Sequence, residues 1–293
     1  MIIDGVFSGG GIKGYGLVGA LQELEERGFV FHRTAGTSAG SIIAAFVAAG
    51  YTGKEMEKLF LDIDLSGLLD KRRGLLPIPL AKWLLVYWKL GLYKGDALEA
   101  WVASKLAVRN VVTFKDVRPK SLRIITSDIT NGKLVVLPDD LPNYGIDPNT
   151  FPVAKAVRMS CSIPYFFEPV KLDVGKSKFL FVDGGVLSNF PMWLFNSDHV
   201  RKERPVIGLR LSVDEIWKPH EVDNAVELFS ALFKTMKDAH DARYISKKHV
   251  HNIVFIPMKG ISAMDFNLND EKKGELMNRG RQCTKEFLKR WTY

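Results

Sequence analysis

Two glycine-rich turns in the first forty residues constrain the fold of this chain. The first turn, residues 8–16, lies between an apolar strand pattern and a helical pattern at 17–27. The second, residues 36–40, lies between a predicted strand at 29–34 and an apolar helical pattern at 39–49. Predicted strands and helices continue to alternate downstream, which indicates a mostly parallel sheet covered by helices on both faces. We therefore expect an α/β fold with three layers, α/β/α.

The second turn has the sequence Gly36-Thr37-Ser38-Ala39-Gly40. A Gly-x-Ser-x-Gly turn between a strand and a buried helix exposes the serine hydroxyl at a sharp bend. The helix N-terminus would also stabilise negative charge that develops beside the serine. The same pentapeptide is compatible with a tight turn whose serine caps the helix. The strand before it and the apolar helix after it favour the first interpretation, so Ser38 is a candidate nucleophile.

The first turn supplies closely spaced backbone N–H groups at a helix N-terminus, which suits an anion or a developing oxyanion. Its glycines also fit a dinucleotide-binding loop, but that loop requires an acidic residue at the end of the second strand. The second strand ends in residues 32–34, His-Arg-Thr, and offers no carboxylate. A Walker A loop does not fit either, because Lys13 is followed by glycine. The candidate oxyanion donors are the amides of Gly9, Gly10 and Gly11.

A serine nucleophile needs a base within hydrogen-bond reach. None of the six histidines lies in a glycine-rich loop at a clear strand end. Asp183 does, because it follows the apolar run 179–182 and precedes two glycines. It is a candidate base, although capping of the next turn would explain it equally well. Functional groups of parallel sheets gather at the carboxyl ends of strands, so we expect the first turn, Ser38 and Asp183 to meet there.

The three motifs, taken in this order, resemble the patatin-like phospholipase family. That family combines a glycine-rich oxyanion segment, here residues 9–14, with a Gly-x-Ser-x-Gly turn and an Asp-Gly-Gly or Asp-Gly-Ala motif, here residues 183–185. Residues 158–167 also look like the stretch that precedes the aspartate in the family. The resemblance extends to about residue 190 and covers the tail only loosely.

The resemblance implies a patatin-like fold and a Ser–Asp dyad that needs no catalytic histidine. Ser38 would be the nucleophile, Asp183 its base, and the amides of Gly9, Gly10 and Gly11 the oxyanion hole. The implied reaction is hydrolysis of a phospholipid, lysophospholipid or neutral acyl ester through an acyl-enzyme intermediate. Two alternatives are an acyltransferase of the malonyl-transferase type, which usually has a histidine beside the nucleophile, and a non-catalytic lipid-binding protein. Thr37 and Ala39 flank Ser38 here, and the intact motifs argue against loss of catalysis.

Residues 70–95 combine aromatic and basic side chains and contain a short amphipathic helical pattern. Such a helix can lie at a membrane surface, and it is equally compatible with packing over the sheet. An apolar slot for an acyl chain could be supplied by residues 75–93 of this segment and by Ile163, Tyr165, Phe166 and Phe167. A phosphate headgroup could meet the basic residues Lys13, Lys71, Arg72 and Arg73.

No linker, repeat or composition shift divides the 293 residues, so we expect one domain over residues 1–293. The motifs lie in residues 1–190, and residues 200–293 would complete the sheet and outer helices. The net charge of +8 favours anionic partners, but the lysines are dispersed among acids and do not indicate nucleic acid. No residue cluster has metal-ligand spacing, and we expect no metal or cofactor. Because no signal peptide or membrane span is recognisable, a cytoplasmic protein, soluble or peripherally bound to a membrane, is expected.

Elsewhere the expected elements follow from periodicity and turn residues. Asn131-Gly132 predicts a hairpin between strands at 122–127 and 134–137. The other expected elements are helices at 54–60, 96–107, 153–159, 222–244 and 269–291, strands at 179–182, 206–211 and 253–256, and a loop at 161–169.

Overall fold

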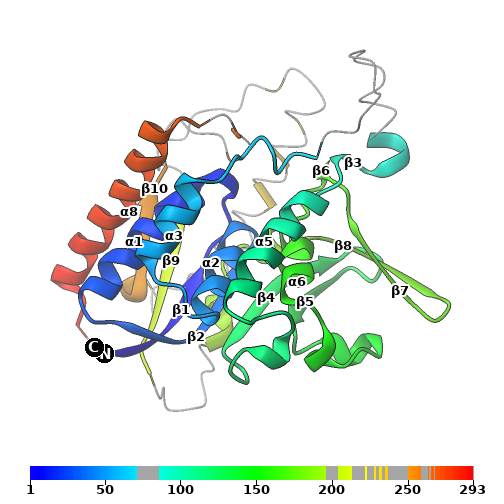
Figure 1. Ribbon diagram of the computed structural model, residues 1–293, viewed down its shortest axis with the longest axis horizontal. Coiled ribbons are helices and arrows are strands. Elements are labelled where there is room, and N and C mark those ends of the chain that lie inside the picture. Colours follow the sequence, from blue (N-terminus) through cyan, green and yellow to red (C-terminus); the bar gives the residue numbers. More distant parts are fainter. Residues whose placement is uncertain are drawn as a thin grey trace.

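The computed structural model describes residues 1–70, 86–195, 204–212, 250–258, 265–266 and 268–292, with single positions 222, 228, 231, 232, 235, 236 and 263. Figure 1 shows a central sheet with helices packed against it. The helices are α1 (Tyr15–Glu26), α2 (Ala39–Ala48), α3 (Gly53–Leu61), α5 (Asp96–Val108), α6 (Val153–Ser160) and α8 (Asp270–Arg290). The strands are β1 (Ile2–Phe7), β2 (Val30–Thr37), β3 (Gly91–Tyr93), β4 (Leu122–Asp128), β5 (Lys133–Leu137), β6 (Tyr165–Phe167), β7 (Val170–Val174), β8 (Ser177–Asp183), β9 (Val206–Ser212) and β10 (Ile253–Pro257).

The main sheet of the described chain has the strand order β10-β9-β1-β2-β4-β8-β7, with β5 paired to β4. The strands from β10 to β4 are parallel, whereas β5 and β8 run antiparallel to β4, and β7 runs antiparallel to β8. The expected α/β class with a mostly parallel central sheet flanked by helices is therefore confirmed. The sheet is mixed because the chain turns back at the hairpin around Asn131 and Gly132 and again between β7 and β8.

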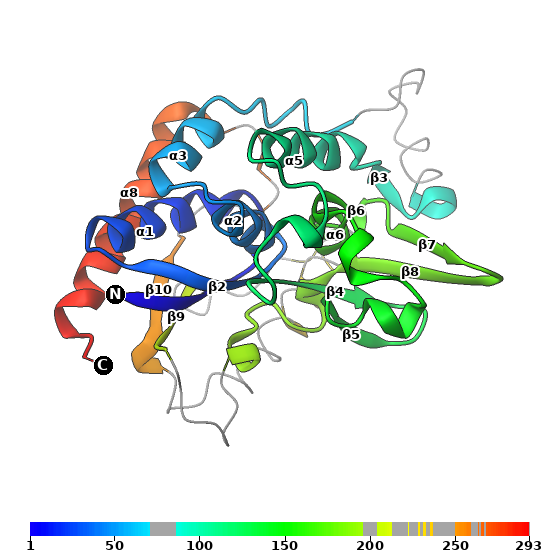
Figure 2. The ribbon, with the colours of Figure 1, turned by 60° about the horizontal axis from the view of Figure 1, so that its bottom comes forward.

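Alternating side chains of the central strands build a core on each face of the sheet. Ile3 and Phe7 of β1 point into the larger core beneath α1 and α2, while Val6 belongs to a smaller core on the other face. In Figure 2, α1, α2, α3, α5, α6 and α8 lie on one side of the sheet, and the short turn η6 (Met192–Phe195) lies on the other. The helical pattern at 222–244 falls mostly outside the described residues.

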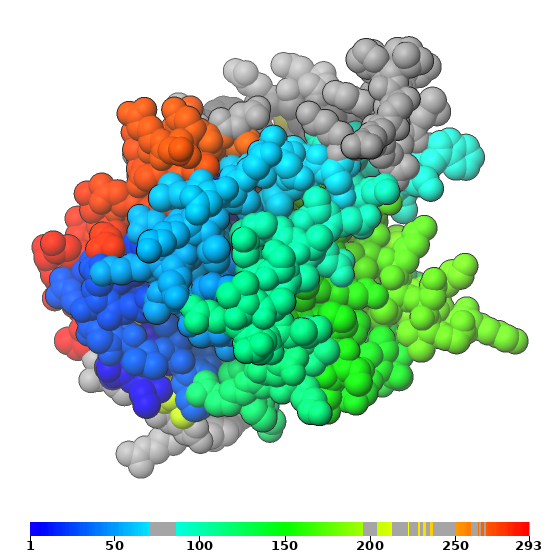
Figure 3. Space-filling model, in the orientation of Figure 1, coloured from blue at the N-terminus to red at the C-terminus, as the bar shows by residue number. Residues whose placement is uncertain are grey.

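The outer helices form the surface of the helical face. In Figure 3, α8, α3 and α5 lie at the molecular surface in this view. Helix α8 packs along α1, α3 packs on α1, and α5 packs on α6. The helix α1 meets α8 very closely: a Cβ on Gly19 would lie 1.8 Å from the Met277 carbonyl oxygen, so only glycine permits this crossing.

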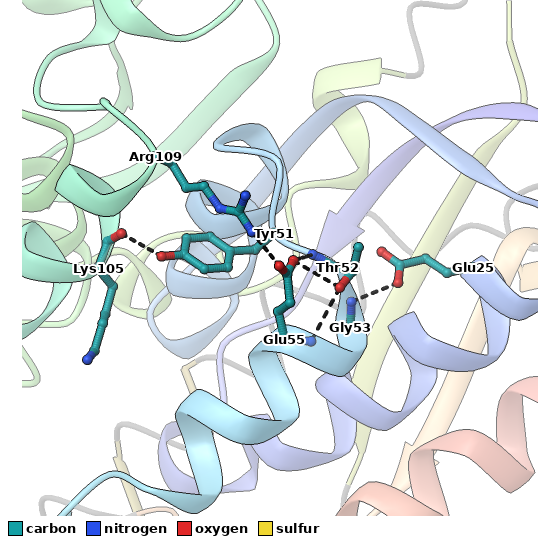
Figure 4. A network of polar contacts seen from close by, with 7 residues as sticks. All are labelled: Glu25, Tyr51, Thr52, Gly53, Glu55, Lys105 and Arg109. Atoms are coloured by element: carbon teal, nitrogen blue, oxygen red, sulfur yellow. Dashed lines mark hydrogen bonds and ion pairs between the residues drawn. The ribbon is translucent and has the colours of Figure 1, made fainter.

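The start of α3 is fixed by a polar network that also reaches α1 and α5 (Figure 4). Thr52 and Glu55 form a capping box, and the Gly53 N–H donates to Glu25 Oε2 of α1 at 2.7 Å. Arg109, just after α5, donates from Nη2 to Glu55 Oε1 at 2.5 Å. These contacts hold the N-terminal end of α3 against the C-terminal end of α5. The C-terminal end of α3 and the N-terminal end of α5 therefore face the same region of the fold.

The strand that ends in Asp183 runs in a different direction from the one that the sequence predicted. Thr37, the last residue of β2, pairs with Ile125, and Asp183, the last residue of β8, pairs with the next residue, Thr126. Both strands lie on the edge of β4 opposite β5, so they approach from opposite directions and end facing each other. Asp183 is thus not at the carboxyl end of a parallel strand, as expected, but at the end of an antiparallel one that stops beside β2.

The segment predicted to be a loop at 161–169 contains the short strand β6, so that prediction was wrong in part. Gly91 and Tyr93 of β3 pair in parallel with Tyr165 and Phe167 of β6 and form a second, two-stranded sheet. This small sheet lies beyond α5 and α6, near the start of β7 and away from the tip of the hairpin formed by β7 and β8 (Figures 1 and 2).

Candidate active site

Ser38 occupies the sharp turn between β2 and α2, as the sequence predicted. Its φ of 53° and ψ of −128° form a conformation that side-chain-bearing residues rarely adopt. The Ser38 carbonyl accepts hydrogen bonds from the Ser41 backbone N–H at 2.8 Å and from Ser41 Oγ at 2.6 Å. The Ser38 N–H donates to Ser160 Oγ at 2.9 Å. Both polar groups of the strained residue are therefore held.

The first glycine turn packs directly against the nucleophile turn. A Cβ on Gly9 would lie 3.1 Å from Ser38 Cβ, and a Cβ on Gly40 would lie 2.3 Å from the Phe7 carbonyl oxygen. Any larger side chain at either position would push the two turns apart. The two turns of the sequence thus form one site at the carboxyl ends of β1 and β2.

The three amides predicted to hold an oxyanion are not equivalent. The Gly9 N–H donates to the Asn189 carbonyl at 3.0 Å, so this amide is already used within the protein. Gly10 and Gly11 lead into the short turn η1 (Gly11–Gly14), and Gly11 has a positive φ of 57°. The oxyanion prediction therefore rests on the amides of Gly10 and Gly11.

Asp183 is buried where β8 meets the end of β2. Its Oδ1 accepts the Gly185 N–H at 2.7 Å, and its own N–H donates to the Ser162 carbonyl at 2.8 Å. The first contact is the turn cap that the sequence also predicted. The backbone of Asp183 and that of Ser38 are thus both tied to residues 160–162.

Residues 160–162, which we call the α6 turn, run from the end of α6 past both candidate catalytic residues. Cys161 lies in the middle of this turn and is buried, with its Sγ 3.9 Å from Ser41 Oγ. Burial, and to a smaller extent the nearby Asp183 charge, raise the pKa of the Cys161 thiol to about 12, while contacts with Ser41 and Ser38 oppose the shift. The thiol therefore stays protonated at neutral pH and is not a competing nucleophile.

An apolar cavity of about 90 Å³ begins at Ser38. Ile42 of α2, Phe60 of α3 and Leu98 and Trp101 of α5 line it, together with Cys161 beside the nucleophile. It lies where the C-terminal end of α3 and the N-terminal end of α5 meet, because the rings of Phe60 and Trp101 have centroids 6.0 Å apart. Leu98 and Trp101 come from the helix predicted at 96–107, but the sequence gave no reason to assign them to the site.

The residues predicted to contact an acyl chain divide into two groups. Ile163 and Phe167 line the cavity, whereas Tyr165 is 49% exposed. Phe166 stacks on Phe266 with ring centroids 5.3 Å apart. Of the basic residues considered for a headgroup, only Lys13 belongs to the described chain; Lys71, Arg72 and Arg73 lie outside it.

Sequence reasoning gave no role to several residues that contact the predicted site, among them Ser160, Cys161 and Asn189. Residues 160 and 161 belong to the stretch that carried the family resemblance, and that was the available signal. Within the ranges given above, no group of three or more His, Cys, Asp or Glu residues could hold a metal ion. No helix in the same ranges has the length and apolar character that crossing a bilayer requires.

Comparison with known proteins identifies a family and related folds. The sequence model described as patatin-like phospholipase matches residues 5–195. The chain is 54% identical over 294 residues to the uncharacterized protein YqhO of Bacillus subtilis (strain 168), covering 100% of both chains. It is 27% identical over 207 residues to the probable lipid hydrolase 463L of Invertebrate iridescent virus 6, covering 68% of this chain and 65% of that protein. Among solved structures, VipD from Legionella pneumophila has a similar fold, with a TM-score of 0.59 and 17% identity over 99% of this chain and 67% of VipD.

Proposed function

The chain belongs to the patatin-like phospholipase family, and from that premise we propose that it hydrolyses lipid acyl esters with a Ser38–Asp183 dyad. The observation that carries this proposal is the apolar cavity that begins at Ser38. An acyl chain in this cavity would place its ester carbonyl at the serine hydroxyl. Pockets lined by apolar side chains with few polar groups at one end are typical of such ligands.

In the proposed first step, Ser38 Oγ attacks the ester carbonyl and Asp183 accepts the proton of the hydroxyl. The negative charge that develops on the carbonyl oxygen is held by the amides of Gly10 and Gly11 and by the N-terminus of α2. The tetrahedral intermediate then expels the alcohol, which takes the proton from Asp183. The products of this step are the free alcohol and an acyl group bound to Ser38.

In the second step, a water molecule attacks the acyl-enzyme carbonyl and gives its proton to Asp183. The same amides hold the second oxyanion, and its collapse returns the proton to Ser38 as the fatty acid leaves. The Gly185 N–H, which binds Asp183 Oδ1, fixes one carboxylate oxygen throughout both steps. Removal of one oxyanion donor typically lowers turnover about 10²–10³-fold.

The experiment is hydrolysis of a panel of phospholipids, lysophospholipids, neutral glycerides and short nitrophenyl esters by matched variants. We expect Ser38→Ala and Asp183→Asn to abolish turnover of every ester that the wild type cleaves. Ser104→Ala serves as the control, because Ser104 is an exposed serine of α5 whose hydroxyl donates to the carbonyl oxygen of Trp101 in its own helix. Turnover by the Ser38 variant, or no turnover by the wild type on any ester, would refute the proposal.

We also propose that the protein contacts lipid surfaces through the aromatic residues near β3. Tyr87 and Trp88 are each 73% exposed and form an edge-on ring pair with centroids 5.2 Å apart. The exposed Tyr165 lies on β6, the strand that pairs with β3 and carries the cavity residue Phe167. Exposed aromatic rings are favoured at the headgroup layer of a membrane. The surface would therefore deliver lipid close to the cavity.

Vesicle co-sedimentation tests this contact. We expect a Tyr87→Ser/Trp88→Ser double variant to lose most binding to vesicles that contain anionic lipid. Val108→Ser is the control, because Val108 is 71% exposed and is the last residue of α5, at the end of the helix away from the cavity residues Leu98 and Trp101. Unchanged binding of the double variant would refute the surface, and equal binding of the wild type to neutral and anionic vesicles would exclude a role for basic residues.

A further inference from the structure

The α6 turn joins the two residues of the proposed dyad, and we propose that Ser160 is a positioning residue that holds Ser38 in its reactive conformation. This inference rests on the proposed function. Ser160 does not belong to any of the three sequence motifs, and its hydroxyl is wholly buried. Its contacts show how the serine turn is held relative to Asp183.

The conformation of Ser38 requires support from its surroundings. A non-glycine residue with φ of 53° and ψ of −128° is strained, and such strain persists only where neighbouring contacts over-determine the backbone. Ser41 binds the Ser38 carbonyl, but Ser41 belongs to the first turn of α2 and moves with it. The Ser38 N–H needs a partner outside α2, and Ser160 supplies it.

The hydrogen bonds of Ser160 fix the direction of its hydroxyl. Its one hydrogen goes to the Ile125 carbonyl of β4, at 2.5 Å. A lone pair of the same oxygen is then left to accept the Ser38 N–H at 2.9 Å. A serine hydroxyl has one donor and two acceptor sites, so this arrangement ties β4 and the nucleophile turn together through one atom.

The same turn also holds the proposed base. The Ser162 carbonyl accepts the Asp183 N–H at 2.8 Å, two residues beyond Ser160. The backbone N–H groups of Ser38 and Asp183 are therefore both hydrogen-bonded to the α6 turn. Arg158 supports that segment from within α6, because its Nη1 donates to Ser162 Oγ at 2.5 Å. Loss of the Ser160 hydroxyl would leave a buried N–H unbonded and free the Ser38 backbone to relax away from the base.

The competing explanation is that Ser160 only satisfies buried polar groups and contributes to stability. Ser121 provides a matched control for that role. It is also buried, and its Oγ donates to the Arg118 carbonyl at 2.7 Å, at the entrance to β4 and away from Ser38. A structural role predicts that Ser160→Ala and Ser121→Ala behave alike, whereas a positioning role predicts a difference in turnover.

The test compares kcat, KM and the rate of fluorophosphonate labelling in Ser160→Ala, Ser160→Cys and Ser121→Ala. We expect Ser160→Ala to lower kcat and the labelling rate together by about 10²-fold, the scale that misplacement of a reacting group produces. KM should stay unchanged, and Ser160→Cys, whose sulfur is a weak acceptor of similar size, should fall between alanine and wild type. Ser121→Ala should retain wild-type kcat.

A kcat within about threefold of wild type in a folded Ser160→Ala protein overturns the inference, as do a wild-type kcat in Ser160→Cys and an equal loss in Ser121→Ala. Ser38→Ala is measured beside these variants to separate the two proposals. Hydrolysis that survives in Ser38→Ala refutes the proposed function. A dead Ser38→Ala protein together with a fully active Ser160→Ala protein refutes only the positioning role.

Discussion

The backbone of Ser38 predicts an unusual stability difference between two variants that lack its hydroxyl. Ser38→Ala and Ser38→Gly both lack the hydroxyl and differ by one methyl group, which would face the cavity. At φ 53° and ψ −128° an alanine retains strain of about 1–3 kcal/mol that glycine avoids. Glycine loses about 0.5–1 kcal/mol through the greater freedom of its unfolded chain. The glycine variant should therefore be the more stable one, by about 1–2 kcal/mol.

Chemical and thermal unfolding of both variants measure this difference. For a chain of this size, 1 kcal/mol corresponds to about 2–4 °C in Tm, so Ser38→Gly should melt about 2–8 °C above Ser38→Ala. Ala103→Gly is the control, because Ala103 is exposed within α5. At that unstrained position the same exchange should destabilise the protein by about 1 kcal/mol. A glycine variant less stable than the alanine variant at residue 38 would refute the strain, and with it the need for Ser160 to hold the turn.

Three further predictions concern the cavity and two buried titratable groups. Leu98→Trp should fill the cavity and lower kcat/KM for long-chain nitrophenyl esters at least tenfold more than for the acetate, measured across a chain-length series. Burial raises the pKa of Glu25, so the native state binds this proton more tightly than the unfolded chain and stability falls as pH rises through that pKa. Glu25→Gln, which keeps an acceptor for the Gly53 N–H, should therefore unfold at higher denaturant than wild type at pH 7 and at the same denaturant in acid. Because the pKa of Cys161 is raised to about 12, this thiol should react with a disulfide reagent at pH 8 only after unfolding; rapid reaction in the native protein would contradict its burial.

The first half of the fold was predictable because its local signals agree with its tertiary structure. The glycine turns, the apolar strands and the 3-4 spacing of α1 all indicated the same strand–turn–helix units, and the structure has them at 2–48. Asn131 and Gly132 likewise specified the hairpin between β4 and β5. These elements form through short-range preferences that a single sequence displays.

The small sheet of β3 and β6 was not predictable in the same way. Each strand has three residues, and Tyr165 begins β6 with a positive φ of 63° that no local signal indicates. The pairing joins residues more than seventy positions apart, so it depends on tertiary contacts. The contacts of Arg158 also depend on tertiary structure, because it donates to the carbonyl oxygens of Lys94 and Glu168, which follow the carboxyl ends of β3 and β6.

The structure revises part of the reason for which the candidate site residues were expected to lie together. A parallel sheet explains why the first glycine turn lies beside Ser38, but Asp183 arrives on an antiparallel strand that ends where β2 ends. The order of the three motifs indicated Asp183 as the base. The expectation that it ends a parallel strand would have placed it elsewhere in the sheet. The use of the Gly9 amide by Asn189 depends on a contact 180 residues away, and the sequence alone did not show it.

Covalent trapping of the nucleophile tests the proposed chemistry most directly. The protein is treated with a fluorophosphonate, digested, and analysed by mass spectrometry to locate the adduct. We expect one adduct on the peptide that contains Ser38, no adduct in Ser38→Ala, and much slower labelling in Asp183→Asn. An adduct on any other residue, or labelling of Ser38→Ala at the wild-type rate, would contradict the assignment of Ser38 as the nucleophile.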